Sequence, residues 1–145
     1  MTQKIGNNLN TLLSSYQIFY QNLRGYHWNI QGKKFFELHL KFEEYYNDVQ
    51  LKIDEIAERI LTLEMIPFHS FSDYIGHSLL KPKTNITDGE IAIMQIREQL
   101  TELIKLQKDI FKYADKETDI ATSDLMTRYI SEQEKTVWML KSFLS

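Results

Sequence analysis

The chain has 145 residues, 43% hydrophobic and 26% charged, which is enough for one domain with a buried core and too short for two. Cysteine is absent, so disulfides, thiolate zinc sites, iron–sulfur clusters and thiol nucleophiles are excluded, and any metal must be held by His, Asp, Glu or water. The net charge is −3, without the basic domain or tail that is typical of a nucleic-acid binder.

Apolar residues recur at steps of three and four along four long segments, and Gly and Pro are few, which favours long helices over strands and turns. The first predicted helix covers about residues 5–30, and Gly32 is placed to close it. The second covers about residues 35–65 and stops before Pro67.

The next segment, residues 67–87, is long for a plain loop. It contains a short predicted helix capped by Ser70, with Asp73 three residues later. A connection of this length can cross a helical bundle instead of making a tight hairpin.

The third long helix is predicted to open with the capping-box pair Thr87 and Glu90 and to end near residue 114. The fourth begins within residues 119–122 and continues to the end of the sequence. Tight connections within each pair of helices and a crossover between the pairs predict an all-α, ferritin-like four-helix bundle, with one domain over residues 1–145.

The second helix has two polar faces of different character. One lies beside the core stripe and contains the possible metal ligands His39, Glu43, Asp54 and Glu58, together with Gln50 and the apolar Leu61. The other carries charges and is predicted to be solvated: Lys41, Glu44, Asp48, Lys52, Glu55 and Arg59. Because the first face also includes apolar side chains, we interpret it as a second buried surface, a subunit interface.

His27 on the first helix is predicted to join His39 and Glu43, because the midpoint between the two histidines is Lys33, in the turn. Positions equidistant from the turn of an antiparallel helical hairpin lie level with each other. Asp54 is about 22 Å from His39 at 1.5 Å rise per residue, too far for one ion. An antiparallel two-fold pairing of this helix would instead place His39 of one chain beside Asp54 of the other, forming two identical metal sites.

Mixed imidazole and carboxylate ligands with room for water suit redox-active iron, although zinc and manganese also accept them. The Glu-x-x-His motifs of an intrachain di-iron bundle are absent from the sequence. The sequence therefore predicts an iron site between subunits and argues against an ordinary ferritin centre inside the bundle.

The stretch HWNIQGKKFFELHLKFE, residues 27–43, resembles the first signature of the Dps mini-ferritins, the starvation-induced DNA-protection proteins. The stretch IDEIAERILTLEMIP, residues 53–67, resembles the second, although Glu64 stands where the family usually has a small or turn-forming residue. The resemblance implies a shell of twelve subunits, a ferroxidase that oxidises Fe(II), preferably with hydrogen peroxide, at the dimer interface, and ferric mineral stored inside.

The resemblance also implies roles for individual residues. His27, His39 and Glu43 match the catalytic metal ligands from one subunit, and Asp54 and Glu58 match those from its mate. Glu43 alternatively supports the ligands without binding the metal itself.

Three further positions match more peripheral features of the family. Trp28 matches the aromatic residue next to the site. Asp119 and Asp124 resemble the acidic residues of a three-fold iron-entry pore, although Asp119 fits equally well as the N-cap of the fourth helix. For His69 and His77 in the crossover, we favour structural or solvated roles over metal binding.

Two other functions compete with the ferroxidase. One is a DNA-compacting protein, which the charge opposes, since twelve copies would carry a net charge of about −36. The other is a helical oligomer with structural zinc at its interface. Without a signal-peptide pattern or a run of about 18 apolar residues, we expect a cytoplasmic protein that does not enter membranes.

Overall fold

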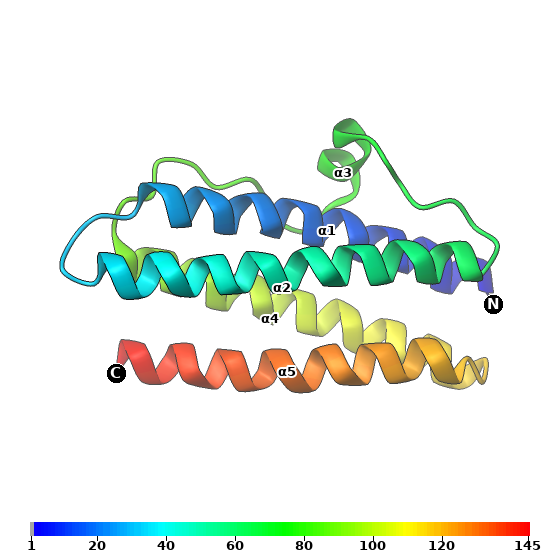
Figure 1. Cartoon of the computed structure of the whole chain (residues 1–145). Helices are drawn as coiled ribbons and strands as arrows, with labels where there is room; N and C mark the ends of the chain where they lie inside the picture. The colour runs from blue at the N-terminus through cyan, green and yellow to red at the C-terminus, as the bar shows by residue number, and fades with distance from the viewer. Residues whose placement is uncertain (1) are drawn as a thin grey trace.

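Four long helices and one short helix make up the computed structural model, which describes residues 2–145 (Figure 1). Their bounds are α1 Thr2–Asn29, α2 Phe35–Thr62, α3 Phe71–His77, α4 Gly89–Lys116 and α5 Ile120–Leu144. The helices α1 and α2 form one antiparallel pair, α4 and α5 form the other, and the crossover with α3 passes along α1 (Figure 1). The predicted all-α bundle is confirmed. None of the helices within residues 2–145 combines the length and apolarity needed to span a bilayer.

The inward stripes of the four long helices meet in one core, whose largest fully buried side chains include Tyr16, Tyr26, Tyr129, Phe19 and Phe42. At mid-bundle, α1, α4 and α5 are joined by a closed ring of three hydrogen bonds. The Tyr16 hydroxyl donates to Gln107 Oε1, Gln107 Nε2 donates to Gln133 Oε1 over 2.7 Å, and Gln133 Nε2 donates back to the hydroxyl over 2.5 Å. Every buried polar group in the ring therefore has a partner.

Two buried asparagines of α1 hold the ends of the crossover. Asn10 bonds through its amide oxygen and nitrogen to the backbone of residues 66–68, at 2.8 and 3.0 Å. Asn22 bonds in the same way to the backbone of residues 81–83, at 2.9 and 3.0 Å. Ser70 caps α3 by accepting from the amide three residues later, as predicted. The crossover is therefore held to α1 along much of its length.

The predicted start of the third long helix is wrong by one residue. Asp88, not Thr87, is the N-cap of α4, and its carboxylate accepts from the amides of Glu90 and Ile91 at 2.8 and 3.0 Å. The carbonyl of Thr87 accepts from the amide of Gln31 over 2.8 Å. This contact with the turn after α1 draws Thr87 out of the helix and leaves the cap to the next residue.

The end of α2 also differs from the prediction, since the helix stops at Thr62 and not near residue 65. Glu64 adopts a φ of 63°, in the left-handed region that a residue with a Cβ enters at a cost of about 1–2 kcal/mol. Glu64, the one position noted as differing from the Dps pattern, is therefore also the residue whose backbone leaves the helical conformation.

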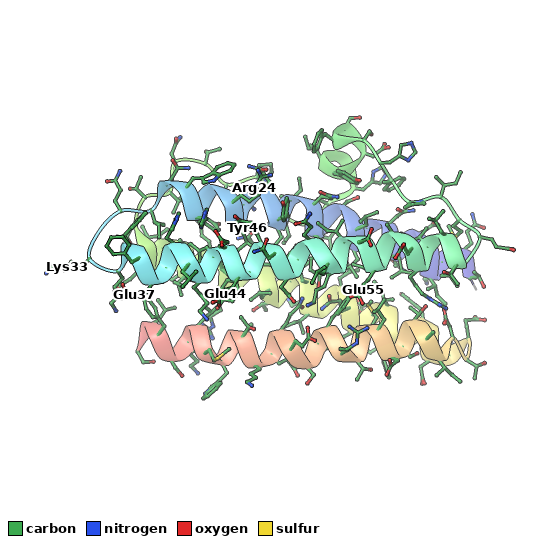
Figure 2. All side chains as sticks on the ribbon, viewed as in Figure 1. Arg24, Lys33, Glu37, Glu44, Tyr46 and Glu55 are labelled. Carbon is green, nitrogen blue, oxygen red and sulfur yellow. The ribbon has the colours of Figure 1, made fainter. Side chains whose placement is uncertain are left out.

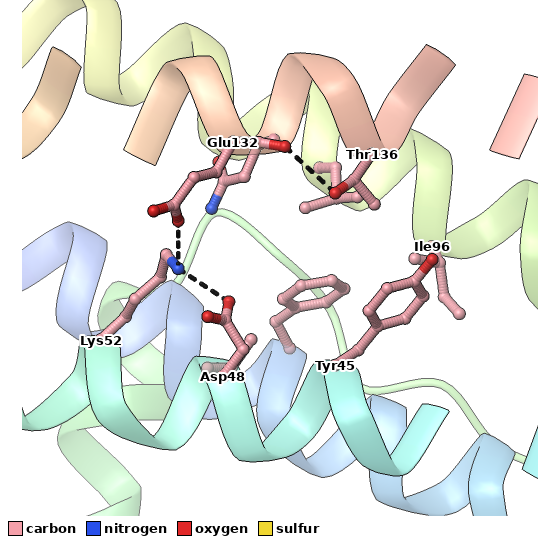
Figure 3. Close-up of a pocket in the computed structure, with 10 residues that line it drawn as sticks. Tyr45, Asp48, Lys52, Ile96, Glu132 and Thr136 are labelled. Carbon is pink, nitrogen blue, oxygen red and sulfur yellow. Dashed lines mark hydrogen bonds and ion pairs between the residues drawn. The ribbon is translucent and has the colours of Figure 1, made fainter. Parts of the chain in front are cut away.

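The charged face of α2 that was predicted to be solvated lies beside α5, so that prediction is wrong for its later residues. Lys52 is only 4% exposed, and its Nζ contacts Asp48 Oδ2 at 2.7 Å and Glu132 Oε2 at 2.8 Å (Figure 3). A cavity of about 40 Å³ lies beside this cluster. Arg59 likewise reaches Asp119 of α5 at 2.8 Å. The helical period in the sequence distinguished the charged face of α2 from its core face, but it could not show that α5 would cover the charged face.

Candidate metal centre between α1 and α2

The imidazoles of His27 and His39 lie against each other near the turn that joins α1 to α2. Their ring centroids are 3.8 Å apart and the rings are within 10° of parallel. Lys33 marks the turn from which both residues are equally distant in sequence (Figure 2). The antiparallel hairpin thus brings the two rings level, as the equal spacing predicts.

Each imidazole is oriented by the backbone of the other helix. His27 Nδ1 lies 2.6 Å from the carbonyl oxygen of His39, and His39 Nδ1 lies 2.7 Å from the carbonyl oxygen of His27. Because a carbonyl oxygen only accepts, both Nδ1 atoms must carry the proton and donate it. With the proton on Nδ1, Nε2 is the ring atom that can offer a lone pair to a metal.

Glu43 lies one helical turn after His39 and brings a carboxylate to the same place. Its Oε1 is 3.7 Å from His27 Nε2, and its side chain is 45% exposed whereas that of His27 is 7% exposed. The carboxylate thus stands at the solvent edge of a nearly buried imidazole. Oxygen and nitrogen bonds of about 2.0–2.2 Å would let these two atoms share one ion.

The other two predicted ligands, Asp54 and Glu58, lie farther along α2 and are exposed. Asp54 lines an open surface depression together with Gln17 and Tyr20 of α1. Over residues 2–145, a single chain contains no group of three or more His, Asp or Glu side chains arranged to hold a metal ion. In the single chain the predicted ligands therefore form two separate groups, the predicted half-sites, one of which includes His27 of α1.

The surface that carries these half-sites is partly apolar and uncovered in the single chain. Trp28 is 55% exposed, and the Arg24 guanidinium lies 4.9 Å from the centre of its ring. Large apolar side chains of α2, α3 and the segment between them are also exposed: Leu40, Leu51, Leu61, Ile66, Phe71 and Ile75. A patch of this kind is typical of a protein–protein interface.

The remaining predicted residues lie outside this centre. Asp119 is the N-cap of α5, and Asp124 is exposed on the same helix. His69 and His77 are exposed in the crossover, where their Nδ1 atoms lie within 3.0 Å of nearby backbone carbonyls.

Two aromatic residues that contact the imidazoles were not singled out from the sequence. Phe35 stacks on His39, and Tyr46 packs edge-on against His27. Both lie on the face of α2 that carries His39, four residues before it and seven after it, so their spacing was the available signal.

Comparison with known proteins places the whole chain in one group. The family model of the ferritin-like domain matches residues 6–145. A DNA protection during starvation protein from Porphyromonas gingivalis is 38% identical over 135 residues, covering 93% of this chain and 85% of the relative. A second one, from Bacillus anthracis, is 34% identical over 148 residues, covering 100% and 99%.

Solved structures agree with these relatives. The crystal structure of a Dps protein from Vibrio cholerae O1 is similar with a TM-score of 0.98 and 53% identity, covering 99% of this chain and 91% of that one. That protein is described as a member of a broad superfamily of ferritin-like diiron-carboxylate proteins. The Dps protein of Staphylococcus aureus is similar with a TM-score of 0.96 and 29% identity, covering 99% of this chain and 96% of that one.

Proposed function

Because the chain belongs to the Dps family of ferritin-like proteins, we propose that it is a ferroxidase that oxidises Fe(II), preferably with hydrogen peroxide, and stores the ferric product in a shell of twelve subunits. Iron is both substrate and cargo in this proposal. The protein would work in the cytoplasm and lower the oxidative damage that free Fe(II) and peroxide cause together.

The observation that carries the proposal is the pair of stacked imidazoles with oriented Nε2 atoms beside a carboxylate. This half-site has too few ligands in one chain. A two-fold axis that pairs α2 with its copy in antiparallel fashion would bring Asp54 and Glu58 of the second chain to His27, His39 and Glu43 of the first. The exposed apolar side chains on the same surface fit its burial in such a dimer.

In this reaction the main role of the protein is to bind and orient its substrates. Neutral imidazoles and carboxylates accept Fe(II), and open coordination positions admit peroxide. One hydrogen peroxide takes one electron from each of two Fe(II) ions and, with two protons from solvent, becomes two water molecules. Because both electrons come from iron, hydroxyl radical is not released.

A mixing experiment tests the shared site directly. His39→Ala and Asp54→Ala should each abolish peroxide-dependent Fe(II) oxidation, whereas His69→Ala, which removes an exposed histidine in the crossover, should not. When the two inactive variants are dissociated and reassembled together, half of the dimers are mixed, and one of the two sites in each mixed dimer is intact. The mixture should therefore regain about a quarter of the wild-type sites. Intact shells without any recovery would contradict the shared-site model.

The two competing functions predict different results. Anaerobic addition of Fe(II) followed by peroxide should give a ferric absorbance signal, and its absence would favour structural zinc at the interface. Direct binding to DNA should be weak because of the net charge of −3 per chain. Tight, salt-sensitive retardation of DNA in an electrophoretic shift assay at low salt would favour the DNA-compacting function instead.

A further inference from the structure

We propose that Phe35 and Tyr46 are positioning residues that hold the imidazoles of His27 and His39 in the one orientation that presents both Nε2 atoms to a divalent metal ion. This inference rests on the proposed function for the identity of the ion as Fe(II). The positioning itself concerns the metal-free protein and can be measured without iron.

Four rings form a continuous column at this end of the bundle. The Phe35 ring lies 4.8 Å from the His39 ring and within 19° of parallel, and His39 stacks on His27 at 3.8 Å. Tyr46 closes the column, with its ring 5.3 Å from that of His27 and almost perpendicular at 83°. Each imidazole is therefore flanked by a second ring as well as by the other imidazole.

The column follows from the spacing of residues on α2. Phe35, His39, Glu43 and Tyr46 succeed one another at steps of four, four and three, so they share one face of the helix. His27 enters from α1 and contacts both His39 and Tyr46. The two flanking rings thus belong to the same rigid element as two of the predicted ligands, and both pack partly against the core.

Tyr46 is itself held in place from the α1 side. It lies between α1 and α2 (Figure 2), and the ring of Tyr20 packs against it at 5.8 Å and 88°. The guanidinium of Arg24 in turn lies 5.2 Å from the centre of the Tyr20 ring. Edge-to-face pairs of this kind are favourable beyond their buried area, so they restrict ring movement.

The flanking rings supply what the hydrogen bonds alone do not. Each Nδ1–H···O=C bond fixes one ring atom, but the imidazole can still tilt about that atom. A tilted ring moves its Nε2 away from the common direction, and a flipped ring loses the Nδ1 bond and its tautomer. Rings packed on both sides of the two imidazoles block these movements, so both Nε2 atoms are oriented before the metal ion binds.

The test uses variants that remove a ring and variants that keep it. Phe35→Leu and Tyr46→Leu remove the rings, whereas Phe35→Tyr and Tyr46→Phe retain them. Phe71→Leu removes an equally large ring that is 80% exposed on α3, away from the column, and serves as the matched control. Size-exclusion chromatography selects variants that assemble like the wild type. If a leucine variant does not assemble, the methionine variant at that position, which is closer in volume, replaces it.

The first readout is histidine NMR of metal-free protein labelled with ¹⁵N-histidine, which is assignable because the sequence has four histidines. His27 and His39 should carry the proton on Nδ1 in the wild type, in Phe71→Leu and in both ring-retaining variants. The ring-removing variants should show a mixture of tautomers. The second readout is Co(II) affinity, which should fall by about 10–100-fold in the ring-removing variants only, as for other groups that orient metal ligands.

The outcomes separate this inference from the proposed function. If the ring-removing variants keep both the Nδ1–H tautomer and the wild-type Co(II) affinity, Phe35 and Tyr46 do not position the imidazoles. If the wild type binds neither Co(II) nor Fe(II), the proposed function fails. The tautomer measurement would then still decide whether the rings orient the histidines.

Discussion

The guanidinium of Arg59, near the end of α2, donates from Nη2 to Oδ1 of Asp119, the N-cap of α5, over 2.8 Å. The same carboxylate accepts from the amide and the hydroxyl of Thr122, at 3.1 and 2.6 Å. Arg59 Nε also donates to the Thr122 hydroxyl over 2.9 Å. Of the two interpretations of Asp119, the N-cap is thus realised in the structure, and its role in an iron-entry pore remains a prediction.

Removing this cap should separate the two roles. Asp119→Ala should lower the free energy of unfolding by about 2 kcal/mol, through the lost cap and the lost partner of Arg59. The melting temperature should fall by about 4–8 °C at equal protein concentration. Asp124→Ala, at an exposed position of the same helix, should change stability by less than about 0.5 kcal/mol. Slower iron uptake with unchanged melting temperature in Asp119→Ala would instead indicate a pore residue.

Lys52 should matter more for stability than an exposed lysine. Lys52→Ala removes a buried side chain and leaves the half-exposed carboxylates of Asp48 and Glu132 without a cation, and we expect a loss of about 1–2 kcal/mol. Lys105→Ala removes an exposed pair with Glu102 and should cost less than about 0.5 kcal/mol. Thermal unfolding of both variants, followed by circular dichroism, measures the difference. Equal melting temperatures would show that burial of Lys52 does not strengthen its ion pairs.

Glu64 offers a stabilising substitution. Its φ of 63° is unfavourable for a residue with a Cβ, whereas glycine adopts this conformation without steric strain. Glu64→Gly should therefore raise the free energy of unfolding by about 0.5–1 kcal/mol. The same exchange at Glu102, an exposed position within α4, should lower it by about 1 kcal/mol. Melting temperatures that move in the same direction for both variants would contradict this account of the end of α2.

Buried phenols should set an alkaline limit to stability. Burial raises the pKa of Tyr26 and of Tyr45 to about 12, from 10.0 for an exposed phenol. Above pH 10 the unfolded chain loses protons that the folded protein retains. The stability that the neutral phenols contribute is therefore complete below pH 10 and declines as the pH rises towards 12.

Tyr26→Phe tests this pH dependence. Its melting temperature should fall less steeply between pH 10 and 12 than that of the wild type. Near pH 7 it should be lower than in the wild type, because Gln95 and Gln99 lose their hydroxyl partner. A slope that matches the wild type across the alkaline range would show that Tyr26 does not carry the effect.

The sequence predicted the helices and the meeting of His27, His39 and Glu43 because both depend on short-range regularities. Apolar periodicity identifies a helix, and equal distance from a turn brings residues level across a hairpin. The predicted first residue of α4 was wrong because the carbonyl of Thr87 accepts a hydrogen bond from the amide of Gln31. That contact joins segments distant in sequence, so a local capping pattern cannot reveal it.

By itself, then, the sequence predicted a four-helix bundle and two groups of candidate ligands that are too far apart in one chain to hold a single ion. Only the tertiary structure decided that α5 covers the face of α2 with Lys52 and Arg59, and that the rings of Phe35 and Tyr46 contact the imidazoles. The physical reason is that the 3.6-residue period of a helix tells only which residues share a face of that one helix. Which neighbour covers a face depends on how all the helices pack together.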